Sequence, residues 1–223
     1  MSTNLPQLLA RLLALATAIP LHEASHAWVS EKLGDPTGRS LGRITLNPLK
    51  HFDPWGFVAM LVIGFGWAKP VPINPRYYKN PKRGMAISAA AGPVSNFLLA
   101  YISMLLYKVV LYISAAAFST STPWFISILF SVLETFVYLN VVLGVFNMLP
   151  VPPFDGSRIL SVFLPDRIYF GIQKHEHIVL VVVAVLMLTG TLSGFLGGLY
   201  IAVFRFMDWA TGYVDMLFLA ILF

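Results

Sequence analysis

The sequence predicts an all-α polytopic membrane protein with about four to six transmembrane segments and one small membrane-associated β-hairpin. Hydrophobic residues make up 57% of the 223 positions and charged residues only 11%, with a mean hydropathy of +0.76. Soluble domains carry about 25% charged residues. Several apolar runs also approach the roughly 20 residues that cross a bilayer. The length suits one compact bundle, so we expect a single domain over residues 1–223.

The distribution of cysteine and of basic residues narrows the class further. The chain contains no cysteine, so disulfides and thiolate metal sites are excluded. Nine of the fifteen lysine and arginine residues lie between Lys32 and Arg83, which is typical of a cytoplasmic loop rather than of a nucleic-acid-binding surface. The first residues lack the basic start and cleavage site of a signal peptide, so we expect them to remain in the first helix.

The first helix is predicted over residues 5–33, ending at Gly34-Asp35-Pro36. It contains His22-Glu23-Ala24-Ser25-His26. Residues four apart share a helix face, with Cβ atoms about 5–6 Å apart, so the two histidines can bind one metal ion. Glu23 is placed to act on a metal-bound water as general base. Ionisable groups in a membrane segment cost roughly 2.5–3.5 kcal/mol each, and three at this spacing favour a metal site over packed, hydrogen-bonded side chains.

The segment from residue 35 to residue 83 is rich in proline, which excludes a long helix. Residues 38–46 alternate enough to predict a short strand. Residues 57–65 are apolar but too short to span as a helix, and we interpret them as a membrane-dipping hairpin whose edge could pair with an extended substrate. Because this loop is basic, the motif end of the first helix should face the cytoplasm and the N-terminus the outside.

Two further helices are predicted over residues 85–118 and 124–149. The first opens with a run of small residues, 89–96, that allows close helix packing, and Asn96 there could link helices or face the site. Glu134 in the next helix is either functional or paired with a polar neighbour such as Asn140. Prolines after residue 149 end this helix. If the predicted helix directions are right, Asp155 then lies on the same cytoplasmic side of the membrane as the two histidines. From the residues alone, Asp155 is either a third ligand or a turn residue with a local hydrogen bond.

The C-terminal part is predicted as two apolar segments, 177–189 and 199–223. His175-Glu176-His177 has the wrong spacing for a metal site on one helix face, and we interpret it as the start of an interfacial helix. Glycines at four positions should loosen the chain between the two segments: Gly190, Gly194, Gly197 and Gly198. The last segment could either cross the membrane or lie along its interface.

Taken together, these motifs resemble the site-2 protease family of intramembrane zinc metalloproteases. The motifs that carry the resemblance are 22–26, Gly92-Pro93-Val94-Ser95-Asn96, the stretch from Asn147 to Gly156, and Gly66-Trp67-Ala68-Lys69-Pro70-Val71-Pro72. The resemblance implies a buried site with one catalytic Zn²⁺ held by His22, His26 and Asp155, with Glu23 as the base that activates water. It further implies that Asn147 helps to hold the substrate or the developing oxyanion. No PDZ or CBS module is recognisable, so the chain is similar to a minimal core form.

The resemblance also implies a function, namely hydrolysis of peptide bonds in or near transmembrane segments of membrane-protein substrates. Asn96 would then lie near the substrate path, and the active site would face the cytoplasm from the cell membrane. Neither a nucleic-acid partner nor a particular oligomeric state follows from the sequence. Two alternatives are a divalent metal transporter and a non-catalytic substrate binder. A transporter needs no general base beside its ligands, and a non-catalytic relative need not retain the whole set of His22, Glu23, His26 and Asp155.

Overall fold

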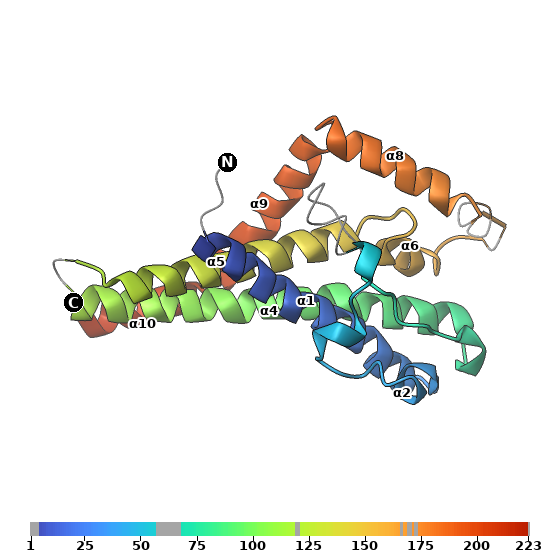
Figure 1. The fold of residues 1–223 in the computed structure, drawn as a ribbon, viewed down its shortest axis with the longest axis horizontal. Coiled ribbons are helices and arrows are strands. Elements are labelled where there is room, and N and C mark those ends of the chain that lie inside the picture. The colour runs from blue at the N-terminus through green and yellow to red at the C-terminus, as the bar shows by residue number, and fades with distance from the viewer. Residues whose placement is uncertain are drawn as a thin grey trace.

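The computed structural model describes residues 5–56, 68–118, 121–165, 167–168, 171 and 174–222 (Figure 1). Its elements are α1 (Leu5–Lys32), α2 (Thr37–Ser40), the 3-10 turns η1 (Pro48–Lys50) and η2 (Pro75–Tyr77), α4 (Pro81–Ala117), α5 (Trp124–Asn147), α6 (Asp155–Leu160), α8 (Glu176–Leu188), α9 (Ser193–Ala210) and α10 (Gly212–Leu222). Every regular element in these ranges is helical, and the one β pairing among them is an isolated antiparallel bridge between Phe52 and Ala68.

Three helices are long and apolar enough to cross a membrane, namely α1, α4 and α5. A fourth span is possible if α8 counts together with α9–α10, a pair bent by 86°. The predicted helical membrane class is therefore confirmed, but the described residues contain three spans, or four with the bent pair, against the predicted four to six. The predicted helix bounds were also close, since α1, α4 and α5 start and end within about four residues of the predicted ranges.

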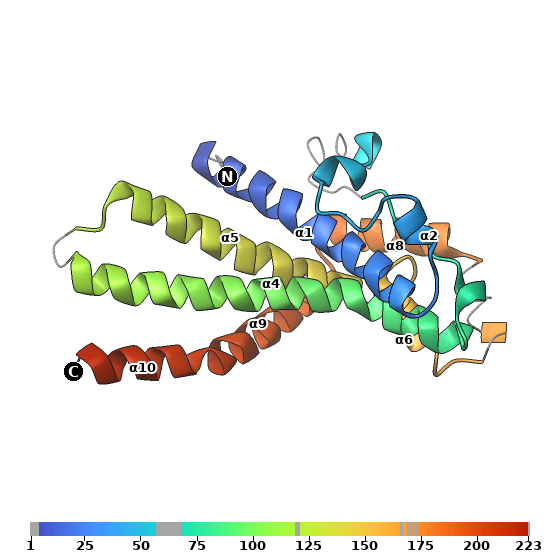
Figure 2. The same cartoon turned by 90° about the horizontal axis from the view of Figure 1, so that it is seen from below.

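Helix α4 is the central element of the bundle. It packs against both α1 and α5, and the bent α9–α10 segment lies along its other side (Figure 2). The core of this arrangement is small and apolar, with the buried side chains Ala100, Met104, Val137, Val141, Val145 and Met207. On the outer face of α4, four residues at helical spacing are each at least half exposed: Leu98, Ile102, Leu106 and Ile113. On a helix long and apolar enough to cross a membrane, such a face is expected to contact lipid.

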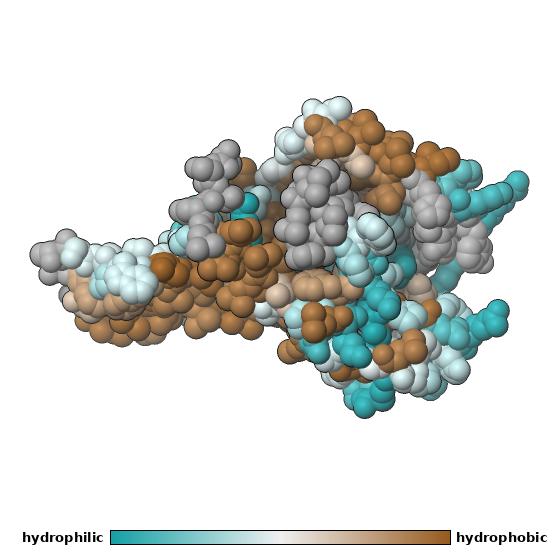
Figure 3. Space-filling view, viewed as in Figure 1, coloured by the Kyte–Doolittle hydropathy of each residue, from teal (hydrophilic) through white to brown (hydrophobic). Residues whose placement is uncertain are grey.

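The surface divides into an apolar arm and a polar end. Figure 3 shows hydrophobic side chains along the arm formed by α4, α5 and α10, while hydrophilic side chains gather at the opposite end, around α2 and the loop that follows it. The 32–83 region, which holds nine of the fifteen basic residues, includes α2 and the loop that follows it. This division places one end of the bundle in water and its long arm in the bilayer.

The loop after α1 is organised around the buried carboxylate of Asp35. Oδ1 accepts hydrogen bonds from the Thr37 backbone N–H at 3.0 Å and from its hydroxyl at 2.5 Å. Oδ2 accepts from the Ser30 hydroxyl at 3.0 Å and from the Asn74 N–H at 2.8 Å. The predicted strand over residues 38–46 is wrong, because the local turn at Asp35 starts the short helix α2 instead. The predicted hairpin over residues 57–65 lies outside the described residues.

The C-terminal helices follow the predicted segments, with one correction. α8 begins at Glu176, as expected for the start of an interfacial helix. Gly190 does interrupt the chain, with a φ of +73°. The other three glycines lie inside α9 and do not loosen it. A helical glycine costs about 1 kcal/mol relative to alanine, and this cost is smaller than that of leaving backbone groups without hydrogen bonds in lipid.

Candidate metal centre

The first two donors of the candidate metal centre come from one face of α1. His22 and His26 are four residues apart and both are buried, and their Nε2 atoms lie 3.0 Å from each other. Each ring is oriented by its other nitrogen. His22 Nδ1–H donates to Asn96 Oδ1 at 2.6 Å, and His26 Nδ1–H donates to the Ser88 carbonyl at 2.7 Å. These acceptors assign the proton to Nδ1, so both Nε2 lone pairs point to the same place.

The third donor is Asp155, the first residue of α6. Its Oδ2 lies 3.2 Å from Nε2 of both His22 and His26. The chain can turn sharply enough because residue 156 is glycine; a Cβ there would collide with the backbone carbonyl groups of Met148 and Leu149. Of the two alternatives left open by the residues, the structure therefore brings Asp155 to the histidines rather than leaving it as a turn residue.

These three side chains fit a metal ion. Their donor atoms all lie within 4.8 Å of one another, and all three residues are buried. Asp155 Oδ2 is buried and has no hydrogen-bond partner within the described structure. Burying a carboxylate oxygen in this way costs free energy unless a bound cation balances its charge. Gly92 of α4 provides the space, since a Cβ there would lie only 2.6 Å from His22 Nε2. Two imidazole nitrogens and one carboxylate oxygen are a donor set typical of catalytic zinc.

A chain of amide groups supports the first histidine. Asn96, which accepts from His22, donates through Nδ2 to Asn140 Oδ1 of α5 at 3.0 Å. Asn140 in turn donates to the Phe136 carbonyl at 2.9 Å. Both asparagines are fully buried. Asn96 thus links two helices and faces the site at the same time, and the role of Asn140 was not predicted because nothing in the local sequence indicates which helix it meets.

Glu23 projects from α1 beside the two histidines and is only partly buried. Its Oε2 accepts a hydrogen bond of 2.9 Å from the backbone N–H of Val71, in the loop that returns toward α4. This bond ties the carboxylate, which follows His22 directly in the sequence, to the polar loop. A general base for water must lie within reach of both the metal and solvent.

Two other predicted residues form hydrogen bonds to groups other than the three donors. Asn147 ends α5, and its amide donates to the Leu143 carbonyl of its own helix at 3.0 Å. Glu134 accepts from the Tyr107 hydroxyl at 3.2 Å on an exposed face. Of the two alternatives for Glu134, the structure thus favours a polar partner, although that partner is Tyr107 rather than Asn140.

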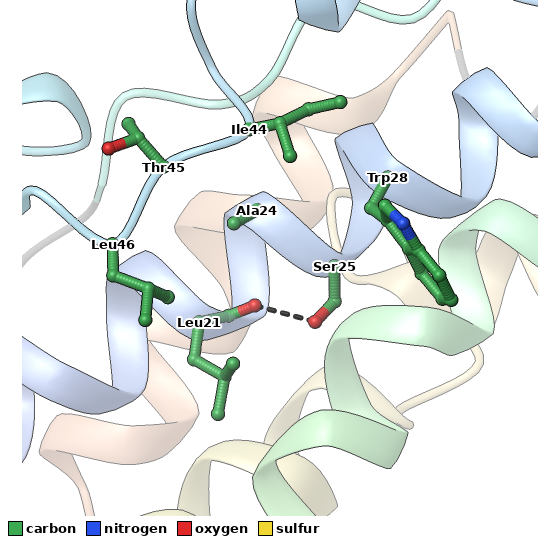
Figure 4. A pocket seen from close by; sticks show the side chains of 7 residues that line it. All are labelled: Leu21, Ala24, Ser25, Trp28, Ile44, Thr45 and Leu46. Atoms are coloured by element: carbon green, nitrogen blue, oxygen red, sulfur yellow. Dashed lines mark hydrogen bonds between the residues drawn. The ribbon is translucent and has the colours of Figure 1, made fainter.

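A groove of about 240 Å³ flanks the motif helix without including the metal donors (Figure 4). It lies between α1 and residues 44–46 of the loop that follows α2. Its lining consists of Leu21, Ala24, Ser25, Trp28, Ile44, Thr45 and Leu46. The Ser25 hydroxyl is bonded to the Leu21 carbonyl at 2.7 Å, so the groove is mostly apolar. The chemistry therefore belongs to the buried point between α1, α4 and α6, and not to this groove.

Apolar helices that carry two histidines, an adjacent glutamate and a third carboxylate at one buried point define an intramembrane metalloprotease. The chain belongs to Peptidase family M50, which matches residues 10–190 and is the site-2 protease family predicted from the motifs. The relative named "Putative zinc metalloprotease YwhC" of Bacillus subtilis is 40% identical over 180 residues, 79% of this chain and 79% of that protein. "Zinc metalloprotease MJ0392" of Methanocaldococcus jannaschii is 28% identical over 164 residues, 74% of this chain and 36% of that protein. No solved structure matches the chain.

Proposed function

We propose that this metalloprotease cleaves membrane-protein substrates with one zinc ion held by His22, His26 and Asp155. The observation that supports this assignment best is the convergence of three buried donors, one of which, Asp155 Oδ2, has no hydrogen-bond partner in the described structure. The zinc metalloprotease names of the relatives agree with it. Family membership also argues against the two alternatives, a metal transporter and a non-catalytic binder.

In the proposed mechanism, Glu23 moves the proton. Bound zinc would act as a Lewis acid toward water and the peptide carbonyl. Glu23 accepts the proton of the attacking water and then delivers it to the leaving amine. Its Oε2 is fixed by the Val71 N–H, so the carboxylate can take up the proton without losing its orientation. Asn96 and Ser88 keep the two imidazole rings in the tautomer that leaves Nε2 available.

Asn147 is proposed to hold the substrate or the oxyanion. It lies at the last residue of α5, eight positions before Asp155 in the sequence. To serve this role its amide must leave the Leu143 carbonyl, a change that costs about one hydrogen bond, roughly 1 kcal/mol. Donors aimed at a developing negative charge contribute several times more than that in a water-poor site.

The active site is proposed to face the cytoplasm. The basic loop and the metal donors lie at the same end of the bundle, and basic loops favour the cytoplasmic side. We further propose that the chain forms one domain in the cell membrane. A transmembrane substrate would unwind locally at the site, because the carbonyl groups of a helix are hydrogen-bonded and shielded. Small or helix-breaking residues near the cleaved bond are the expected preference.

The experiment that tests this function is cleavage of a membrane-embedded reporter by purified protein, with zinc content measured in parallel. Glu23→Gln should retain zinc and lose cleavage by about 10³-fold or more, as for other essential proton-transfer groups. Glu134→Gln is the matched control, since this acid lies on an exposed face of α5 and should not matter. Cleavage by Glu23→Gln at the wild-type rate would reject the assignment of the base, and a wild-type protein without zinc would reject the site.

A further inference from the structure

Arg43 is buried in the loop between α1 and α4, with only 6% of its surface exposed. Its guanidinium group donates through Nη1 to the Pro70 carbonyl at 3.1 Å and through Nη2 to the Lys69 carbonyl at 2.5 Å. The planar guanidinium group therefore binds two neighbouring carbonyl groups at once. Burying a guanidinium is costly unless it is hydrogen-bonded. Nη1 and Nη2 donate to backbone carbonyl groups rather than to a carboxylate, while Nε has no hydrogen-bond partner among the described residues.

His51 holds the same segment from the other side. Its backbone carbonyl accepts from the Lys69 N–H at 2.8 Å, and its fully buried ring donates through Nε2 to the Thr45 carbonyl at 2.8 Å. The remaining ring nitrogen, Nδ1, faces Arg43 Nη2 at 3.5 Å. Lys69 is thus fixed at its N–H by His51 and at its carbonyl by Arg43.

The next peptide unit connects this arrangement to the catalytic base. The Pro70 carbonyl and the Val71 N–H belong to one planar peptide group, in which they point in opposite directions. Arg43 binds the carbonyl end, and the N–H end donates to Glu23 Oε2 at 2.9 Å. Any rotation of this peptide moves both hydrogen bonds together. Arg43 and Glu23 are therefore coupled through a single rigid unit.

We propose that Arg43 is a positioning residue for hydrolysis, acting on Glu23 through the Pro70–Val71 peptide. The segment needs such support, because no helix or ladder orients residues 70–74 and the prolines at 70 and 72 have no N–H of their own to bind. Arginine suits the task because its planar fork reaches two carbonyl groups at once, whereas lysine presents a single ammonium. The inference rests on the proposed role of Glu23 as general base.

The test compares Arg43→Met and Arg43→Lys with Arg39→Met in the same reporter assay. Arg39 is the matched control, since it belongs to the same loop, its side chain is 66% exposed and it pairs with Glu31 at the surface. A misplaced catalytic group can cost about 10²-fold, so Arg43→Met should lower kcat by about 10- to 100-fold. KM and zinc content should stay at the wild-type values. Arg43→Lys should recover part of kcat, and Arg39→Met should equal the wild type.

A second measurement separates positioning from a merely structural role. If Arg43 acts through the base, then Arg43→Met should add little to the loss already caused by Glu23→Gln, because coupled residues are not additive. Full additivity of the two losses would overturn the proposal. So would a loss of zinc or of thermal stability in proportion to kcat, or a wild-type kcat for Arg43→Met. If Glu23→Gln itself stays active, the proposed function fails independently of Arg43.

Discussion

At the scale of single residues, the metal centre depends on how closely α4 approaches α1. Gly92 lies against both imidazole rings, and no side chain fits between them and the α4 backbone. The run of small residues, which the sequence alone explains as ordinary helix packing, thus makes room for the metal donors. The same approach brings the Ser88 carbonyl and the Asn96 amide to the two Nδ1 atoms. A methyl group added at Gly92 should therefore weaken metal binding.

Gly92→Ala is expected to weaken zinc binding by about 10- to 100-fold, because the Cβ would displace the histidine nitrogens proposed to bind the metal. Zinc content after purification at a fixed free zinc concentration is the measurement. Gly194→Ala is the control, since Gly194 is also helical and a Cβ there meets open space. Equal zinc content in the two variants would contradict the assigned site.

Asn96→Ala should weaken zinc binding by about 10- to 100-fold, the usual effect of removing the partner of a ligating histidine. Asn140→Ala, one step further out, should have a smaller effect in the same direction. Ser103→Ala serves as the control, because Ser103 is buried in the same helix and its hydroxyl donates to the Leu99 carbonyl of that helix. Competition with a chelator of known affinity measures the three variants. An Asn96→Ala protein with unchanged affinity would mean that the amide chain does not support His22.

At the scale of elements, the loop after α1 depends on a neutral histidine. Burial is the largest influence on His51 and lowers its pKa; the hydrogen bond to Thr45 raises the pKa, the positive charge of Arg43 lowers it further, the charge of Glu23 raises it slightly, and the net shift is downward. The folded loop therefore takes up a proton at a lower pH than the unfolded chain, whose histidine has a pKa of about 6.5. This contribution to stability is fully present above pH 6.5 and is lost as the pH falls toward the folded-state value.

The midpoint of thermal unfolding should consequently fall between pH 7.5 and pH 5.5 by more in the wild type than in His51→Gln. Glutamine can keep a donor toward the Thr45 carbonyl and an acceptor toward Arg43, but it does not titrate. His175→Gln is the comparison, because that ring is exposed and bonds to the Gly171 carbonyl. If the unfolding midpoints of the wild type and His51→Gln fell equally with pH, the His51 ring would not be the cause of the pH-dependent loss of stability.

The C-terminal elements are joined to α4 by a polar cluster within the apolar arm. Lys108, buried in α4, lies 2.8 Å from Asp208 and 2.6 Å from Asp215. Tyr112 adds a hydrogen bond of 3.0 Å to Asp215. One lysine therefore satisfies carboxylates of both α9 and α10, on either side of the break at Thr211. Charged groups at membrane depth are stable only when paired in this way.

Lys108→Met should release α10 from α4 and lower the stability by about 1–3 kcal/mol. This is less than the 3–5 kcal/mol of a fully buried pair, because the Asp208 side chain is 59% exposed. Thermal unfolding together with proteolysis at the C-terminus provides the measurement. The triple variant Lys108→Met, Asp208→Asn, Asp215→Asn should recover part of the loss, since no unpaired charge remains. A triple variant less stable than the single one would contradict this account.

At the scale of the whole molecule, the absence of cysteine makes the topology directly testable. Lys79→Cys, in the basic loop, should react with a membrane-impermeant thiol reagent only from the cytoplasmic side. Ser121→Cys, between α4 and α5, should react only from the outside. Both positions are exposed, so reactivity reports the side of the membrane rather than burial. The opposite pattern would place the active site outside the cell and reverse the proposed orientation.

Several features of this protein follow from the sequence alone, because they depend on local spacing. The apolar runs predict α1, α4 and α5, since a segment in lipid must satisfy its own backbone hydrogen bonds and is therefore helical. The four-residue spacing of His22 and His26 predicts a shared face for the same geometric reason. The motif set also identifies the family, which the comparisons confirm. The strand predicted over residues 38–46 failed because the carboxylate of Asp35 competes locally for the backbone.

Other features were decided only by the tertiary structure, because they join residues far apart in the chain. The sequence did not determine whether Asp155 is a ligand or a turn residue, since 129 positions separate it from His26 (155 − 26). Likewise, the sequence could not show that Asn140 supports Asn96, or that Arg43 reaches the peptide that holds Glu23. A hydrogen bond requires its two groups to meet within about 3 Å. Local patterns determine which face a side chain occupies, but only the packing of α1, α4, α5 and the loop determines which group it meets there.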